Sequence, residues 1–227
     1  MLSLAIVFTV SYFVGAIPTS IIVAQLRRGI DIRQHGSGNA GGTNVVRVMG
    51  LRAGFVVIAF DILKGYVATM LVPKLMFGPI PFNNQTPFDD FTVVQIICGA
   101  AAVLGHVWTV FAGFRGGKGM ATAGGMLVGL APIEVLVSVA VFALVFIISR
   151  YVSLGSLSAA LAFPLTMFFR ENIFHAEVTG YGVLIFFSIG IALLLIFTHR
   201  SNIKRLLEGT ENRLTNLRFS LRNKGRS

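Results

Sequence analysis

The stretch GHVWTVFAGFRGGKGMATAGG, residues 105–125, organises the chain around it. An apolar segment ends near His106, opens into glycines that carry Arg115 and Lys118, and then becomes apolar again. Glycine lets the backbone approach a ligand closely and aim N–H groups at an anion. Two cations on such a turn therefore indicate either a phosphate site or a basic loop that only follows the positive-inside rule.

The composition around this stretch is that of a membrane protein. The 227 residues are 55% hydrophobic and 12% charged, and the mean hydropathy is +0.80. Soluble domains have about 25% charged residues, so we predict an all-α integral membrane protein. The length fits a single membrane-embedded domain, residues 1–227, with a basic cytoplasmic tail at 199–227. The lone Cys98 excludes an intrachain disulfide.

Long apolar runs predict about seven transmembrane helices. They cover residues 4–25, 51–72, 91–112, 119–131, 133–148, 154–169 and 181–198. Pro18 is expected to kink the first of them. The apolar run after residue 119 contains Pro132, and we predict that it folds as a short helix hairpin over 119–149.

The distribution of cations supports this hairpin and sets the orientation. The net charge is +10, and most Lys and Arg residues lie in short loops beside the apolar runs or in the tail. Placing the loops around Arg33, Lys118 and Arg150 on one side requires the chain to leave and return between the last two. The positive-inside rule then predicts an outer N-terminus and a cytoplasmic C-terminus. Because the cations flank membrane spans, nucleic-acid binding is not predicted.

Three polar stretches fall on the predicted inner side. The first, GSGNAGGTNVVR at 36–47, combines glycines with hydroxyl and amide groups and ends on Arg47, whose planar fork suits a phosphate. The second is the opening stretch. The third, THRSNIKRLLEGTENR at 198–213, places His199 and Asn202 near one face of a helix. A flexible membrane loop and an interfacial helix are the alternative interpretations of the first and third.

Several more familiar chemistries are not supported. The turn before Lys118 is one residue too short for a nucleotide P-loop, and Gly119 replaces the magnesium-binding hydroxyl. The spacing of His and Cys fits no zinc site, so no metal or cofactor is predicted. Asp61 and Lys64, three residues apart within a span, are expected to pair inside the bundle. Glu134 is expected near the outer end of the hairpin without a catalytic role.

Together the three stretches resemble the motifs of a known family. GSGNAGGTNVVRVMG, GHVWTVFAGFRGGKGMAT and HRSNIKRLLEGTE are similar, in order and spacing, to those of the bacterial acyl-phosphate-dependent glycerol-3-phosphate acyltransferases, the PlsY family. FDILKG at 60–65 and the region of Ser153 fit as well. The chain departs from the usual pattern at Gly42, Thr109 and Arg115, with small or charge-preserving changes.

The resemblance implies an enzyme of phospholipid biosynthesis in the bacterial cytoplasmic (inner) membrane, with its active site on the cytoplasmic side. It would move a fatty acyl group from acyl phosphate to the 1-hydroxyl of glycerol 3-phosphate, giving lysophosphatidic acid and inorganic phosphate. The catalytic residues implied are Ser37, Arg47, Lys118 and His199. The implied substrate- or phosphate-binding residues are Gly38, Asn39, Thr43, Asn44, Arg115, Gly116, Gly117, Ser153 and Asn202. His106 is expected to be structural or to support these residues.

Two other function classes remain open from the residues alone. An organic-phosphate transporter would use the same cations, but it predicts polar residues along a path through the membrane. A phosphotransferase acting on lipid head groups commonly needs acidic clusters for magnesium, and no such cluster lies on the inner side. If the protein is an acyltransferase, the acyl chain should lie between helices, in the bundle that faces membrane lipid. The oligomeric state is not predicted.

Overall fold

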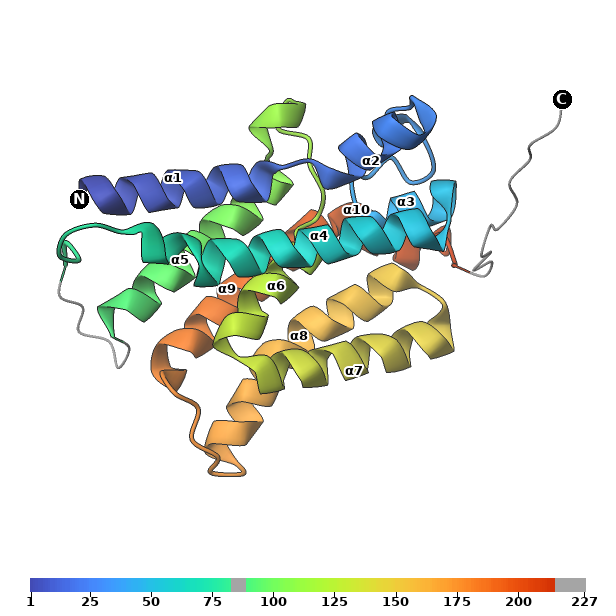
Figure 1. The fold of residues 1–227 in the computed structure, drawn as a ribbon. Helices are drawn as coiled ribbons and strands as arrows, with labels where there is room; N and C mark the ends of the chain where they lie inside the picture. Colours follow the sequence, from blue (N-terminus) through green and yellow to red (C-terminus); the bar gives the residue numbers. More distant parts are fainter. Residues whose placement is uncertain (83–88, 215–227) are drawn as a thin grey trace, which may run out of the picture.

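The computed structural model describes residues 1–82 and 89–214, and this part of the chain is built from helices (Figure 1). The α-helices are α1 (Leu2–Ala16), α2 (Thr19–Arg28), α3 (Gly42–Met49), α4 (Leu51–Met70), α5 (Asp90–Val107), α6 (Met120–Leu130), α7 (Pro132–Ser149), α8 (Val152–Asn172), α9 (Tyr181–Thr198) and α10 (Arg200–Leu207). Six helical segments are long and apolar enough to cross a membrane, and α6 is a shorter apolar helix. The prediction of an all-α membrane protein is confirmed. Residues 215–227 of the predicted tail lie outside the described residues.

The first span is broken where the proline was expected to kink it. α1 ends at Ala16 and α2 begins at Thr19, with Pro18 between them. The hairpin predicted over 119–149 is also confirmed, because Ala131 separates α6 from α7 and Pro132 is the first residue of α7. Proline suits that first position, since its missing N–H would have no helical partner there. The 11 residues of α6 extend only about 16 Å.

The helices form two packed groups, which share a buried apolar core of α5, α6, α8 and α9 and are linked by the hairpin. α1 packs against α5, and α4 packs against α6, whereas α7 packs against α8 and α8 against α9. Small residues allow the closest approaches: a side chain on Gly65 would collide with the backbone of Thr122, and one on Gly15 with that of Ala102. This use of small residues is typical of helices that pack within membranes.

The predicted pairing of Asp61 with Lys64 is confirmed, and the structure adds three partners. Nζ of Lys64 lies 2.8 Å from Oδ1 of Asp61 and donates a hydrogen bond of 2.9 Å to the carbonyl of Ile17, at the break between α1 and α2. Thr19 donates its hydroxyl to Asp61 at 3.2 Å. Nδ1 of His106 lies 3.6 Å from the same carboxylate. These contacts tie α2, α4 and α5 together.

Glu134 lies near the start of α7 and forms an ion pair with Arg170 of α8. Its carboxylate is buried, and Glu134 does not line the cavity described below. The residue therefore stabilises the contact between α7 and α8.

Substitution Arg170→Ala should lower the apparent Tm in detergent by about 10 °C, because it leaves a buried carboxylate without its cation. The exposed Lys74→Ala variant is the matched control and should melt like the wild type. Replacing both partners, Glu134→Leu with Arg170→Leu, should restore most of the loss. An unchanged Tm in Arg170→Ala would show that this ion pair does not hold the two helices.

Candidate active site

A cavity of about 390 Å³ lies between α4 and α6 on one side and α7, α8 and α9 on the other. One end of it is polar, and the other is apolar. The polar lining residues are Ser37, Asn39, Thr43, Asn44, Arg47, Asp61, His106, Lys118, Ser138, Ser153, Ser156, Ser188, His199, Asn202 and Glu211. The three separated polar stretches of the sequence therefore meet at one place.

Asn44, at the first turn of α3, organises the first of these stretches. Its buried side chain accepts a hydrogen bond of 2.8 Å from the N–H of Ser37. Its Nδ2 donates to the carbonyls of Ile32, His35 and Asn39 at 3.1, 2.9 and 3.0 Å. One amide side chain thus satisfies four backbone groups, which holds Ser37 and Asn39 at the cavity wall.

The second stretch forms a tight turn against the end of α5. The N–H of Gly116 donates to the carbonyl of Val107, and that of Gly117 donates to the carbonyl of His106, both at 3.1 Å. A side chain on either glycine would collide with His106. These glycines are therefore needed for close packing of the turn, and their N–H groups are already used.

Four of the predicted binding residues consequently lie away from the cavity wall. They are Gly38, Arg115, Gly116 and Gly117. Arg115 is exposed, and Gly38 has a positive φ of 73° in the first loop, where its N–H donates to the carbonyl of His35. The expectation that the glycine N–H groups of the second turn face a phosphate is thus corrected: Lys118 alone of these turn residues, from Arg115 to Lys118, lines the cavity.

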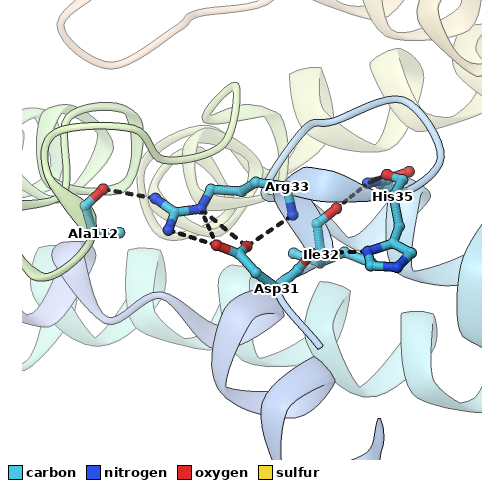
Figure 2. Close-up of polar contacts among 6 residues, drawn as sticks. Asp31, Ile32, Arg33, His35 and Ala112 are labelled. Atoms are coloured by element: carbon cyan, nitrogen blue, oxygen red, sulfur yellow. Dashed lines mark hydrogen bonds and ion pairs between the residues drawn. The ribbon is translucent and has the colours of Figure 1, made fainter. Parts of the chain in front are cut away.

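Arg33 links the first loop to the second (Figure 2). Asp31 caps the short 3₁₀ turn Ile32–Gln34. Its carboxylate also accepts hydrogen bonds from Nε and Nη2 of Arg33, and the distance from Nη2 to Oδ2 is 2.8 Å. Nη1 of Arg33 then donates a hydrogen bond of 2.8 Å to the carbonyl of Ala112. The hydrogen bonds from Arg33 lower the pKa of Asp31, so this pair is charged throughout the physiological range. Because Ala112 immediately precedes the glycine turn, Arg33 fixes where that turn begins.

Glu211, which the sequence analysis did not single out, holds the third stretch in place. Its buried carboxylate accepts hydrogen bonds from Nδ2 of Asn202 at 2.8 Å, the hydroxyl of Ser153 at 3.1 Å and Nε of Arg205 at 2.7 Å. Asn202 in turn accepts a hydrogen bond from Lys118. Ser153 lies in the first turn of α8, whose N-cap is Tyr151.

Burial shapes the charges at the polar end. Burial, together with the positive charge of Arg205, lowers the pKa of Lys118 to about 8. Burial and the charge of Lys118 lower the pKa of His199 to about 4. Burial alone would raise the pKa of Glu211, but hydrogen bonds from Asn202 and Arg205 hold it below its ordinary value. With its pKa at about 4, His199 is neutral at pH 7.

His199 and Arg47 both keep a polar atom available for a ligand. Nδ1 of His199 lies 2.7 Å from the carbonyl of Leu195, so Nδ1 carries the hydrogen and Nε2 is left as an acceptor. Within the described residues, the buried Nε of Arg47 has no hydrogen-bond partner, although its Nη2 donates to the carbonyl of Asn212. A buried donor without a partner is costly, and an anion in the cavity would satisfy it.

The comparison with protein families decides what kind of protein carries this site. Residues 5–209 match the family model for glycerol-3-phosphate acyltransferase. The chain belongs to that family. This glycerol-3-phosphate acyltransferase family member is 47% identical to the glycerol-3-phosphate acyltransferase of Chlorobaculum tepidum, over 95% of this chain and 98% of the relative. The corresponding protein of Chlorobaculum parvum is 46% identical over the same shares.

A solved structure agrees with the assignment. The crystal structure of PlsY, an integral membrane glycerol 3-phosphate acyltransferase in its glycerol 3-phosphate form, superimposes with a TM-score of 0.77. It is 35% identical in sequence, and the match covers 95% of this chain and 97% of that one. The predicted membership of the PlsY family is confirmed.

Substitution Arg33→Ala should lower kcat/KM for glycerol 3-phosphate about 10- to 100-fold, because the turn carrying Lys118 loses its anchor and reacting groups are misplaced. Asp31→Asn should also lower kcat/KM, since the guanidinium of Arg33 then loses its ion pair. Steady-state kinetics measure both effects. Arg33→Lys should recover part of the loss, and the exposed Arg27→Ala is the control. Wild-type kcat and KM in Arg33→Ala would contradict a positioning role.

The pKa of Lys118 sets a further expectation for pH dependence. The profile of kcat/KM for glycerol 3-phosphate reports the free enzyme, so it should fall above about pH 8 as Lys118 loses its proton. In Lys118→Arg the guanidinium stays protonated, so any remaining activity should extend to higher pH. Lys204→Arg, at an exposed position, should keep the wild-type profile. A wild-type profile that stays flat to about pH 10 would exclude Lys118 as the titrating group.

Proposed function

We propose that the chain transfers a fatty acyl group from an acyl phosphate to the 1-hydroxyl of glycerol 3-phosphate, releasing lysophosphatidic acid and inorganic phosphate. The observation that carries this proposal is a single cavity that joins a cationic, hydrogen-bonding end to an apolar end. An acyl phosphate has the matching chemistry, because a phosphate and a hydrocarbon chain meet at its reacting carbonyl.

The proposed reaction needs few groups from the protein. The 1-hydroxyl oxygen attacks the carbonyl carbon and forms the new ester bond. The bond between that carbon and the phosphate oxygen breaks, and the phosphate leaves with the bonding electrons and takes up the hydroxyl proton. Phosphate is already a good leaving group, so positioning and electrostatic stabilisation supply the catalysis. No protein base is required in this scheme.

The cations at the polar end support the assignment of roles. We assign Arg47, Lys118 and His199 to holding phosphate and stabilising developing negative charge. Arg47 offers its unpaired Nε. Burial and the charge of Lys118 lower the pKa of His199 to about 4, so it would contribute a charge only after a bound phosphate raises that pKa. Binding of a dianion between these groups therefore favours proton uptake by the imidazole.

The remaining polar residues are assigned to shaping the site. We assign Ser153 and Asn202, which both donate hydrogen bonds to Glu211, to orienting glycerol 3-phosphate. We assign Ser37 a catalytic role. Its neighbours on the first loop and at the start of α3 form the cavity wall beside it. Those neighbours are Asn39, Thr43 and Asn44. Arg115, Gly116 and Gly117 keep a role only in the shape of the second turn.

The proposed setting is the bacterial cytoplasmic membrane, as the bacterial relatives support. We propose that the polar end of the cavity faces the cytoplasm, with the N-terminus outside, because the basic loops belong on the inner side. We also propose that residues 1–227 act as one membrane-embedded acyltransferase domain. The apolar end of the cavity does not favour the alternative of an organic-phosphate transporter, since that function needs a polar path through the membrane.

The direct test is to mix the purified protein with palmitoyl phosphate and glycerol 3-phosphate and to follow inorganic phosphate and lysophosphatidic acid together. Equal amounts of both products should appear. Substitution Lys118→Ala should lower kcat/KM by about 100-fold or more, because a cation aimed at developing charge is lost. Thermal unfolding should show that this variant is still folded.

The matched control is Lys204→Ala, which removes an exposed lysine from α10 and should leave turnover unchanged. Phosphate without lysophosphatidic acid would make the protein a hydrolase and refute the proposal. Activity with an acyl thioester but not with acyl phosphate would refute the proposed donor. Normal turnover in Lys118→Ala would refute the assignment of the site.

A further inference from the structure

Two adjacent glycines of α6 have opposite surroundings. Gly125 packs against the backbone of Ile62 in α4, and any side chain there would collide with it. Gly124 also lines the cavity, but among the described residues a Cβ at this position would meet no atom within 4 Å. Helix packing therefore explains the glycine at 125 and leaves the glycine at 124 without a packing reason.

The cavity beside Gly124 is open at its side. Three of its lining residues are exposed on the apolar surface: Ile62 of α4 by 41%, Val128 of α6 by 41% and Val139 of α7 by 56%. α6 packs against α4 whereas α7 packs against α8, and the two helices diverge from their turn (Figure 1). The side opening therefore lies between the two packed groups and faces the region that lipid would occupy.

The opening is continuous with the polar site. The cavity runs from Ser153 to Phe163 along α8, a rise of about 15 Å, and it is lined by Leu195 and Ile191 of α9 on the way. This distance can hold the part of a fatty chain nearest its carbonyl. The rest of a long chain would need to leave the cavity sideways. The exposed apolar lining residues Ile62, Val128 and Val139 mark such a side opening beside Gly124.

We propose that the fatty acyl chain of the donor enters the cavity from the bilayer between α6 and α7, and that the absent side chain at Gly124 keeps this passage open. The inference rests on the proposed function, because it takes the occupant to be an acyl chain whose phosphate lies at the polar end. Gly124 is then a specificity-determining position for long acyl chains.

The test compares donors of different length in matched variants. Gly124→Leu fills the passage, whereas Gly190→Leu adds the same side chain to α9 at a position that is equally open and does not line the cavity. The ratio of kcat/KM for palmitoyl phosphate to that for butyryl phosphate should fall about tenfold or more in Gly124→Leu. It should stay within about twofold of wild type in Gly190→Leu.

A second variant guards against misfolding of Gly124→Leu. Gly124→Cys can be purified first and then labelled with a bulky maleimide, since the native Cys98 is buried. Labelling should cause the same selective loss with palmitoyl phosphate, and labelling of Gly190→Cys should not. An unchanged donor ratio in labelled Gly124→Cys would overturn the lateral passage while leaving the acyltransferase activity intact. Failure of the wild type with both donors would instead refute the proposed function.

Discussion

An ionised side chain in an apolar bundle must have a partner, and this constraint fixes where the segments of the chain meet. Asp61 and Lys64 neutralise each other inside the membrane domain. Lys64 also donates a hydrogen bond to the carbonyl of Ile17, beside Pro18 at the break between α1 and α2. The charges of α4 thus hold both sides of the break in the first span, through Ile17 and Thr19. Because Asp61 also lines the cavity, the same contacts set one wall of the site.

At the polar end of the cavity the charges do not cancel, because cations outnumber carboxylates there. Here Arg47, Lys118 and Arg205 surround one carboxylate, that of Glu211. The acid holds Asn202, Ser153 and Arg205 in place but does not neutralise all of the positive charge. The surplus is what a phosphate substrate would balance. Glu211 can therefore preorganise the site without competing fully with the anion that enters it.

The sequence predicts much of this arrangement because its signals are local. Apolar runs define the spans, and the distribution of cations requires the hairpin after residue 119. Contacts that cross the chain are not visible in this way. In the sequence, Glu211 is one of two acids in a basic tail, yet it accepts a hydrogen bond from a serine 58 residues away. The sequence of Gly116 and Gly117 predicts an anion-binding turn. Their N–H groups instead donate to carbonyls at the end of α5, a tertiary contact that composition cannot reveal.

The position of Glu211 in the chain has a consequence for biosynthesis. It follows all of the membrane helices, and it organises residues that flank the last of them. Chains are made from the N-terminus at about 5–20 residues per second, so Glu211 is synthesised seconds after Arg47 and Lys118. Arg47 and Lys118 thus spend seconds at the membrane surface without this counter-ion. Anionic lipid head groups are suited to neutralise them until the nascent chain is complete.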